Sequence, residues 1–80
     1  MIAFVDGIVE EVNTDSITVN VSGIGYLVYC ANPFSFQRYK NERTKIHTYQ
    51  YVREDFLALY GFHTSRQRAL FVNLLAVCGI

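Results

Sequence analysis

Apolar and polar residues alternate along most of the first 62 positions, which is the period of a β-strand with one buried face. Residues 2–12, IAFVDGIVEEV, are rich in β-branched side chains and predict a long first strand, in which Gly7 predicts a bulge or a sharp bend. Turn-forming clusters, NTDS and SGIG, connect the first three strands into a meander. Four further strands are predicted at residues 17–21, 26–30, 45–52 and 56–62.

The alternation stops in two places, which predict a connection and a helix. Residues 31–45 contain Pro33 and many polar side chains, so we expect a loop or a short helical turn that crosses one end of the sheet. After residue 63 the apolar residues recur at helical spacing, at Leu70, Phe71, Leu74, Leu75 and Cys78. Thr64 and Gln67 have the spacing of a capping box at the start of this helix, and Gly79 fits the position after its C-cap.

Five strands with a non-strand connection between the third and the fourth match a five-stranded Greek-key barrel of the OB type. We therefore predict a mainly β fold, an OB-fold barrel followed by a C-terminal helix. An SH3-like barrel and a five-stranded sheet with one packed helix are the alternatives. OB barrels bind oligonucleotides or sugars through strands two and three and the hairpin loops.

Composition narrows the class of protein. The seven Lys and Arg residues balance the seven Asp and Glu residues, which argues against a protein whose whole surface binds phosphate. Cys30 and Cys78 match no metal or redox spacing, so we expect buried free thiols and no metal or other cofactor. No run of apolar residues is long enough to cross a membrane, and no signal peptide is visible at the start, so we expect a cytoplasmic protein.

The most charged triplet, Arg53, Glu54 and Asp55, lies where the last two strands should turn. Neighbouring residues of an extended chain point to opposite faces, which disfavours an acid/base pair, and no third ligand has metal-binding spacing. A solvated hairpin tip is one reading. The other is electrostatic, since two carboxylates on a stiff hairpin repel phosphates that come within the screening length.

One basic cluster, with Tyr39 inside it, consists of Arg38, Lys40, Arg43 and Lys45. Such a cluster tracks a phosphate backbone or forms a solvated loop, and the sequence favours the loop. His47 and His63 have no serine or cysteine partner at a known spacing, so both are expected to be structural or surface residues.

Four segments carry a resemblance to a known family: DGIVEEV, VSGIGYLV, VREDFLALYGF and RQRALFVNLLAVCGI, at residues 6–12, 21–28, 52–62 and 66–80. In order and spacing the chain resembles the RuvA family, the Holliday-junction-binding subunits of the bacterial branch migration complex. The resemblance implies that residues 1–63 form the N-terminal OB barrel and that residues 64–80 form the first helix of a helix-hairpin-helix domain. In the family this helix leads into a Gly-hydrophobic-Gly-Pro hairpin, so the chain is expected to stop within that motif, at Gly79 and Ile80.

The resemblance also implies roles. Glu54 and Asp55 match the family's acidic pin, which faces the crossover of a four-way DNA junction, and Arg53 is expected to hold a phosphate or to pair with one of these carboxylates. The implied protein is a non-catalytic scaffold for branch migration in DNA recombination and repair. Its implied partners are three further copies in a homotetramer, a RuvB-type hexameric ATPase that binds a C-terminal domain and a RuvC-type resolvase.

Two alternatives and one departure stay open. In the first alternative the barrel only mediates oligomerisation, and every DNA contact lies in other sequence. In the second, Glu54 and Asp55 bind a metal in a nuclease. Asp6 departs from the family, since many relatives would have a basic residue there, which puts a DNA contact from the first strand in doubt.

Overall fold

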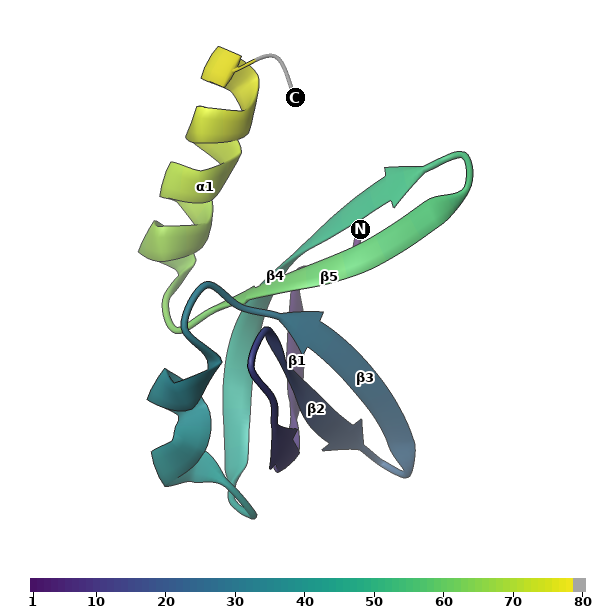
Figure 1. Cartoon of the computed structure of the whole chain (residues 1–80), viewed down its shortest axis with the longest axis vertical. Helices are drawn as coiled ribbons and strands as arrows, with labels where there is room; N and C mark the ends of the chain where they lie inside the picture. Colours follow the sequence, from purple (N-terminus) through teal and green to yellow (C-terminus); the bar gives the residue numbers. More distant parts are fainter. Residues whose placement is uncertain (79–80) are drawn as a thin grey trace.

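The computed structural model describes residues 1–78 of the chain as five strands, a 3₁₀-helix and an α-helix (Figure 1). The predicted strands are all present, and the predicted connection contains the 3₁₀-helix. The elements are β1 (Phe4–Val12), β2 (Ser16–Val21), β3 (Ile24–Tyr29), η1 (Pro33–Tyr39), β4 (Arg43–Arg53), β5 (Phe56–Phe62) and α1 (Ser65–Cys78).

The strands form a closed barrel in the order β1-β2-β3-β5-β4. Closure depends on β1, which pairs antiparallel with β2 on one side and with β4 on the other. The two remaining edges meet where β3 and β5 run parallel, at Val28–Leu59 and Tyr29–Tyr60. The structure confirms the predicted OB-type barrel with a C-terminal helix, and closure excludes the open five-stranded sheet.

The β2–β3 hairpin turns more tightly than the sequence indicated. Only Ser22 and Gly23 form the turn, with φ angles of 52° and 92°, and the side chain of Asn20 accepts a hydrogen bond of 2.8 Å from the Gly23 amide. Two consecutive positive φ angles are typical of the two-residue turns that match the twist of a hairpin. Ile24 and Gly25 therefore belong to β3, which begins two residues before the prediction.

The barrel interior is filled by the inward side of each strand and closed by η1. Phe36 of η1 is 2% exposed and packs with the strand residues, so the segment after β3 does cross one end of the barrel. Removing these side chains from water is the main force that holds so small a domain together. The core cluster consists of Val5, Val9, Ile17, Val19, Val28, Phe36, Ile46 and Leu59.

Gly7 has a different role from the predicted bulge. The pairing register of β1 and β2 shifts between Val9 and Glu11, so the irregularity lies after Gly7. Gly7 is needed for close approach, because a Cβ atom there would lie 2.3 Å from the carbonyl oxygen of Asn20. Gly7 is therefore structurally required, but for close contact with the backbone of Asn20 and not for a bulge.

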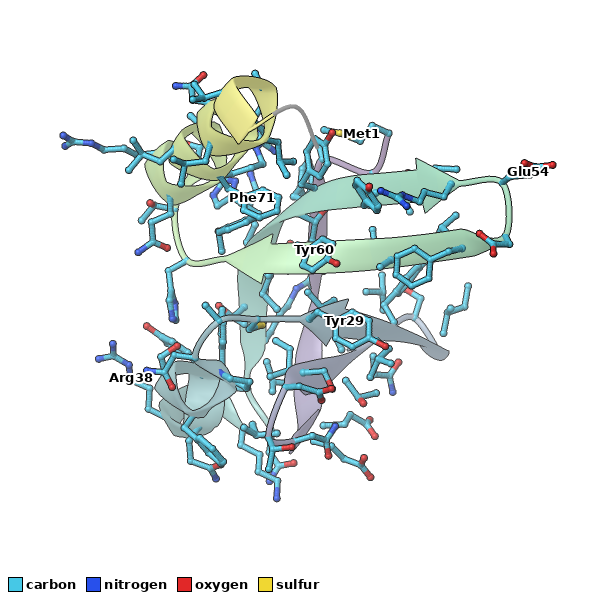
Figure 2. All side chains as sticks on the ribbon, turned by 45° about the horizontal axis from the view of Figure 1, so that its top comes forward. Met1, Tyr29, Arg38, Glu54, Tyr60 and Phe71 are labelled. Carbon is cyan, nitrogen blue, oxygen red and sulfur yellow. The ribbon has the colours of Figure 1, made fainter. Side chains whose placement is uncertain are left out.

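Helix α1 lies against the outer side of the β4–β5 pair and is fixed at its start (Figure 2). The Gln67 amide donates to Thr64 Oγ1 at 3.1 Å, and Gln67 Oε1 accepts from the His63 amide at 3.0 Å, which confirms the predicted cap with the return bond one residue earlier. Phe71 anchors the helix, with ring centroids 5.8, 5.5 and 5.2 Å from Tyr49, Tyr60 and Phe62.

Candidate nucleic-acid interface

The β4–β5 hairpin projects from the barrel as its longest arm (Figure 1). The two strands stay paired from His47–Phe62 to Arg53–Phe56, which is the last pair before the turn. Glu54 and Asp55 form the tip of this arm, and both are exposed. The fold therefore holds two adjacent carboxylates at the end of a long paired hairpin.

The tip carries two negative charges that form no salt bridge within residues 1–78. Among residues 1–78 the one salt bridge joins Arg43 to Asp6, on other strands. Figure 2 shows the Glu54 side chain directed away from the body of the molecule. An exposed carboxylate pair of this kind repels an approaching phosphate and attracts cations.

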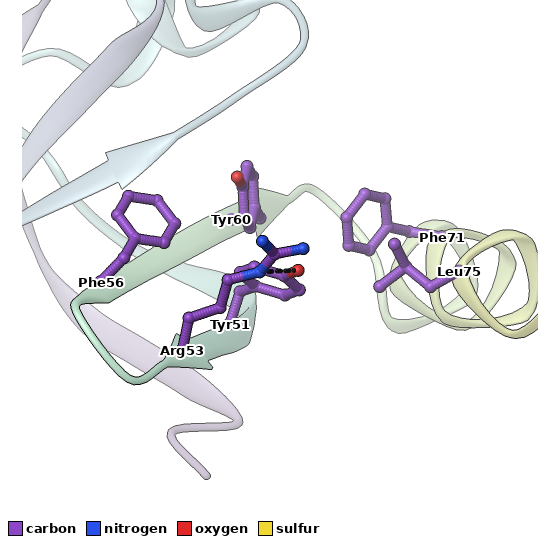
Figure 3. A pocket seen from close by; sticks show the side chains of 6 residues that line it. All are labelled: Tyr51, Arg53, Phe56, Tyr60, Phe71 and Leu75. Atoms are coloured by element: carbon purple, nitrogen blue, oxygen red, sulfur yellow. Dashed lines mark hydrogen bonds between the residues drawn. The ribbon is translucent and has the colours of Figure 1, made fainter. Parts of the chain in front are cut away.

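Arg53 does not pair with either tip carboxylate, so the expected ion pair is absent. Its Nε donates a hydrogen bond of 2.7 Å to the Tyr51 hydroxyl, and its guanidinium carbon lies 5.4 Å from the Tyr51 ring centroid (Figure 3). Residues two apart on a strand share a face, which is why these two side chains meet. The cation is thus held along the hairpin, one residue behind the acidic tip.

A pocket of about 330 Å³ lies between the hairpin and α1 (Figure 3). Its walls are mainly aromatic. The lining residues are Tyr51, Arg53, Phe56, Tyr60, Phe71 and Leu75. The opposite face of the hairpin is also apolar near the tip, where the cross-strand pair Val52 and Leu57 is 62% and 59% exposed. Both faces of the arm therefore favour contact with another surface.

The predicted basic cluster is not one site. On η1 the Arg38 guanidinium lies over the Tyr39 ring, with its carbon 5.2 Å from the ring centroid. Arg43 pairs with Asp6, with 3.0 Å between Nε and Oδ1. This hydrogen bond is the main reason why the pKa of Asp6 is lowered. Asp6 therefore directs its charge toward a cation of the neighbouring strand.

Sequence reasoning missed a partner of His63. Its Nε2 lies 2.6 Å from Ser35 Oγ, and its ring stacks on Phe36 with centroids 3.9 Å apart. The Ser35 hydroxyl donates to the Asn32 carbonyl at 2.6 Å, so Nε2 of His63 must be the donor to Ser35. Twenty-eight residues separate the two partners, and no local motif joins them. His63 is structural, as predicted, and it ties the start of α1 to η1.

The sequence also led to predictions about a metal site, the thiols, a membrane helix and the end of the chain. Residues 1–78 hold no group of three or more His, Cys, Asp or Glu side chains that would bind a metal. Cys30 is a half-buried free thiol, and burial raises its pKa to about 11. In the described part of the chain, no helix has the length and apolar character to cross a membrane. Gly79 and Ile80 lie outside the described residues.

Comparison with known proteins assigns the barrel to a family. The model of the RuvA N-terminal domain family matches residues 1–61. The chain belongs to the RuvA N-terminal domain family. The match covers almost the whole barrel, including the projecting hairpin of the RuvA N-terminal domain, and stops just before α1.

Relatives extend the similarity over α1. Proteins named "Holliday junction branch migration complex subunit RuvA" are 50% identical in Anoxybacillus flavithermus, 51% in a Geobacillus species and 48% in Bacillus thuringiensis, in each case over all 80 residues of this chain. The matched part is 41%, 40% and 38% of these RuvA proteins. The chain thus spans about two fifths of the length of the curated relatives it matches.

Proposed function

We propose that this chain is the junction-facing domain of a DNA-binding subunit that supports branch migration at Holliday junctions, without catalytic activity of its own. The observation that carries the proposal is the exposed pair Glu54 and Asp55 at the tip of the long β4–β5 hairpin, on a barrel of the RuvA N-terminal domain family. The names of the relatives support the same role. Because bacterial DNA lies in the cytoplasm, the proposal includes a cytoplasmic location.

The range of electrostatic forces fixes where the tip has to act. Two unit charges 4 Å apart interact by about 1 kcal/mol in water, and physiological salt screens them beyond about 8 Å. Glu54 and Asp55 must therefore lie among the phosphates to separate the strands of a crossover. A projecting hairpin meets that requirement better than a carboxylate on the flat surface of the barrel.

Assembly multiplies the effect, and the proposal includes a homotetramer. Two carboxylates in each of four copies gather eight negative charges around one crossover. The arm also has the apolar surface that contact between copies requires, since Val52, Phe56 and Leu57 are 62%, 45% and 59% exposed. Packing of one arm against the next copy would bury these side chains and hold the tips near a common axis.

We propose the remaining partners from the resemblance to the RuvA family. We propose that residues 64–78 open a helix-hairpin-helix domain, in which backbone groups hold DNA phosphates, and that a RuvB-type hexameric ATPase moves the DNA. A RuvC-type resolvase is the third protein of the proposed complex. In this scheme the barrel shapes the junction while its partners supply energy and cleavage.

The proposal is tested by junction preference. The chain is grafted in place of the matched 80 residues of the Anoxybacillus flavithermus relative, and its affinity for a four-way junction and for linear duplex is measured by fluorescence anisotropy. Reversing the tip charges, with Glu54→Lys and Asp55→Lys, is expected to tighten binding to both DNAs, because the tip no longer repels phosphates. The ratio of the affinity for the junction to the affinity for duplex is expected to fall, because repulsion outside a crossover is lost.

The matched control reverses two other adjacent, exposed carboxylates, with Glu10→Lys and Glu11→Lys. It makes the same change in net charge at the far end of β1. If the control lowers the ratio as much as the tip variant does, or if the tip variant leaves the ratio unchanged, the proposal is wrong.

A second candidate is a module that only mediates oligomerisation. The exposed apolar residues of the hairpin and the balanced charge of the chain favour it. Under this candidate the tip variant forms the same oligomer and has the same preference for junctions. Loss of junction preference with an unchanged oligomer, measured by light scattering, would exclude it.

A further inference from the structure

The outer face of β4 carries a basic and aromatic row that the acidic tip does not explain. Ile46 and Thr48 point into the barrel and are fully buried, so the alternate side chains point outward. These outward residues are Arg43, Lys45, His47, Tyr49, Tyr51 and Arg53. The strand holds three Lys or Arg residues and no Asp or Glu, so its formal charge is three minus zero, +3, in a chain whose net charge is zero.

Arg68 of α1 adds positive charge beside the part of this row that runs from Lys45 to His47. Lys45 Nζ lies 4.2 Å from the centroid of the Phe4 ring, and Phe4 is the strand partner of His47. Arg68 of α1 reaches the same edge, where its Nη1 donates a hydrogen bond of 2.6 Å to the Ala3 carbonyl. We name Arg43, Lys45 and Arg68 the β4 cationic row.

The cations of the row are positioned but only partly neutralised. Arg43 is the one member with a salt bridge within residues 1–78, to Asp6, and its side chain is still 74% exposed. The Lys45 ammonium lies on the Phe4 ring, and its strand partner Asp6 offsets part of its charge. The Arg68 guanidinium donates to a backbone carbonyl, which carries no net charge. Cations that are already held in place lose little side-chain entropy when an anion binds.

The position of the row along β4 suits a DNA duplex. At about 3.3 Å per residue, the ten steps from Arg53 to Arg43 cover roughly 33 Å along the strand. Because β4 bends where it leaves the barrel (Figure 1), the straight distance is shorter than one turn of B-DNA, about 34 Å. Helix α1 packs on Tyr49 between the tip and the row, so a duplex arm that leaves a crossover at the tip would pass beside α1 and reach the row within about one turn. Phosphates of that arm would meet cations after they have passed the acidic tip.

We propose that the β4 cationic row binds the sugar-phosphate backbone of a duplex arm. The position of that arm rests on the proposed function, but the row's affinity for duplex phosphates does not. The site is expected to contact phosphates without reading bases, because ammonium and guanidinium ions on the outer face of a strand meet the backbone of a duplex first. A protein without net charge then contacts DNA through this local positive patch, while its negative charges at the hairpin tip remain apart from the patch.

Salt dependence of duplex binding tests the site directly. The grafted chain is titrated with a linear duplex about two turns long, roughly 20 base pairs, between about 50 and 200 mM salt. Each lost phosphate contact lowers the slope of log Kd against log salt by about 0.9, equivalent to about a threefold change in Kd over this range. We expect Lys45→Ala and Arg68→Ala each to lower the slope by about 1.

A gain-of-binding variant separates the site from loss of folding. Asp6→Asn frees Arg43 and is expected to tighten duplex binding by about threefold and to raise the slope by about 1. Arg38→Ala is the matched control, because it removes one exposed cation from η1, outside the row, and should change the slope by less than half as much. Equal effects of Arg38→Ala and Lys45→Ala, or no effect of Asp6→Asn and Lys45→Ala, would overturn the proposal.

The outcomes also separate this proposal from the proposed function. Row variants that leave duplex affinity unchanged, in a protein whose tip variants still alter junction preference, contradict the row alone. Tip variants without effect on junction preference, together with row variants that change the salt slope, contradict the proposed function alone. Equal competition by polyglutamate, a polyanion without sugar or phosphate, would show general polyanion binding and would also overturn the row as a DNA site.

Discussion

At the scale of single residues, the barrel depends on places where a side chain has no room. Gly7 packs against the backbone of Asn20, so Gly7→Ala forces two strands apart and is expected to cost about 1–3 kcal/mol or more in the free energy of unfolding. Gly25→Ala is the matched control, because its Cβ would meet only the Thr18 methyl at 3.7 Å, an ordinary contact. Denaturant unfolding measures both; equal midpoints would contradict the close-approach role of Gly7.

His63 makes stability depend on pH. Its pKa is lowered, first because burial disfavours the charged ring and second because Arg38 is nearby. The unfolded chain therefore binds this proton near pH 6.5, while the folded protein binds it only at lower pH. The contribution to stability is fully present above about pH 6.5 and is lost as the pH falls through the lowered pKa.

The measurement compares melting temperatures of the original chain and of His63→Gln at about pH 7.5 and about pH 5.5. Glutamine does not titrate and keeps a donor for Ser35, so the variant is expected to lose less stability on acidification. His47, whose pKa burial and the charges of Lys45 and Arg68 also lower, titrates in both proteins and cancels in the comparison. An equal fall in melting temperature would show that His63 does not contribute.

At the scale of elements, period-two alternation predicted all five strands, and a change of period with a capping box predicted α1. Local signals succeeded because each element buries one face. The predicted start of β3 was wrong, because the composition of the SGIG cluster does not reveal that only its first two residues form the turn. The pair Ser35 and His63 depends on closure of the barrel, so no local signal marked it.

The tip shows the same division between local and global information. Sequence placed Glu54 and Asp55 at a hairpin turn, and the structure agrees. The contact of Arg53 with Tyr51 was open to prediction from their shared strand face, whereas the ion pair that charge alone suggested is absent. The cationic row needed the fold, because Arg68 reaches Ala3 from 65 residues away.

Packing of α1 on the hairpin is expected to depend on one side chain. Phe71 contacts three aromatic rings and is half-buried, so Phe71→Ala should cost roughly half of the 3–5 kcal/mol that a fully buried Phe loses. Leu74→Ala, on the exposed side of the same helix, is the control and should change little, since Leu74 is 62% exposed. Amide exchange of residues 65–77 reports the effect, and similar exchange in both variants would contradict the anchor.

At the scale of the whole molecule, charge is separated along a single strand. Strand β4 carries +3, its tip carries two carboxylates, and the chain as a whole is neutral. In the proposed assembly this pattern places repulsion at the crossover and attraction along the arms. A junction bound in this way is held open at its centre and is still bound along its duplexes.

Energy transfer between fluorophores on the ends of two junction arms tests the central claim, that the tip carboxylates hold the crossover open. The grafted protein is expected to convert the free junction's mixture of transfer efficiencies into one open state. Protein carrying Glu54→Lys and Asp55→Lys should still bind but should leave a mixture, while Glu10→Lys with Glu11→Lys should behave like the original. One open state with the reversed tip, at saturating protein, would contradict the account.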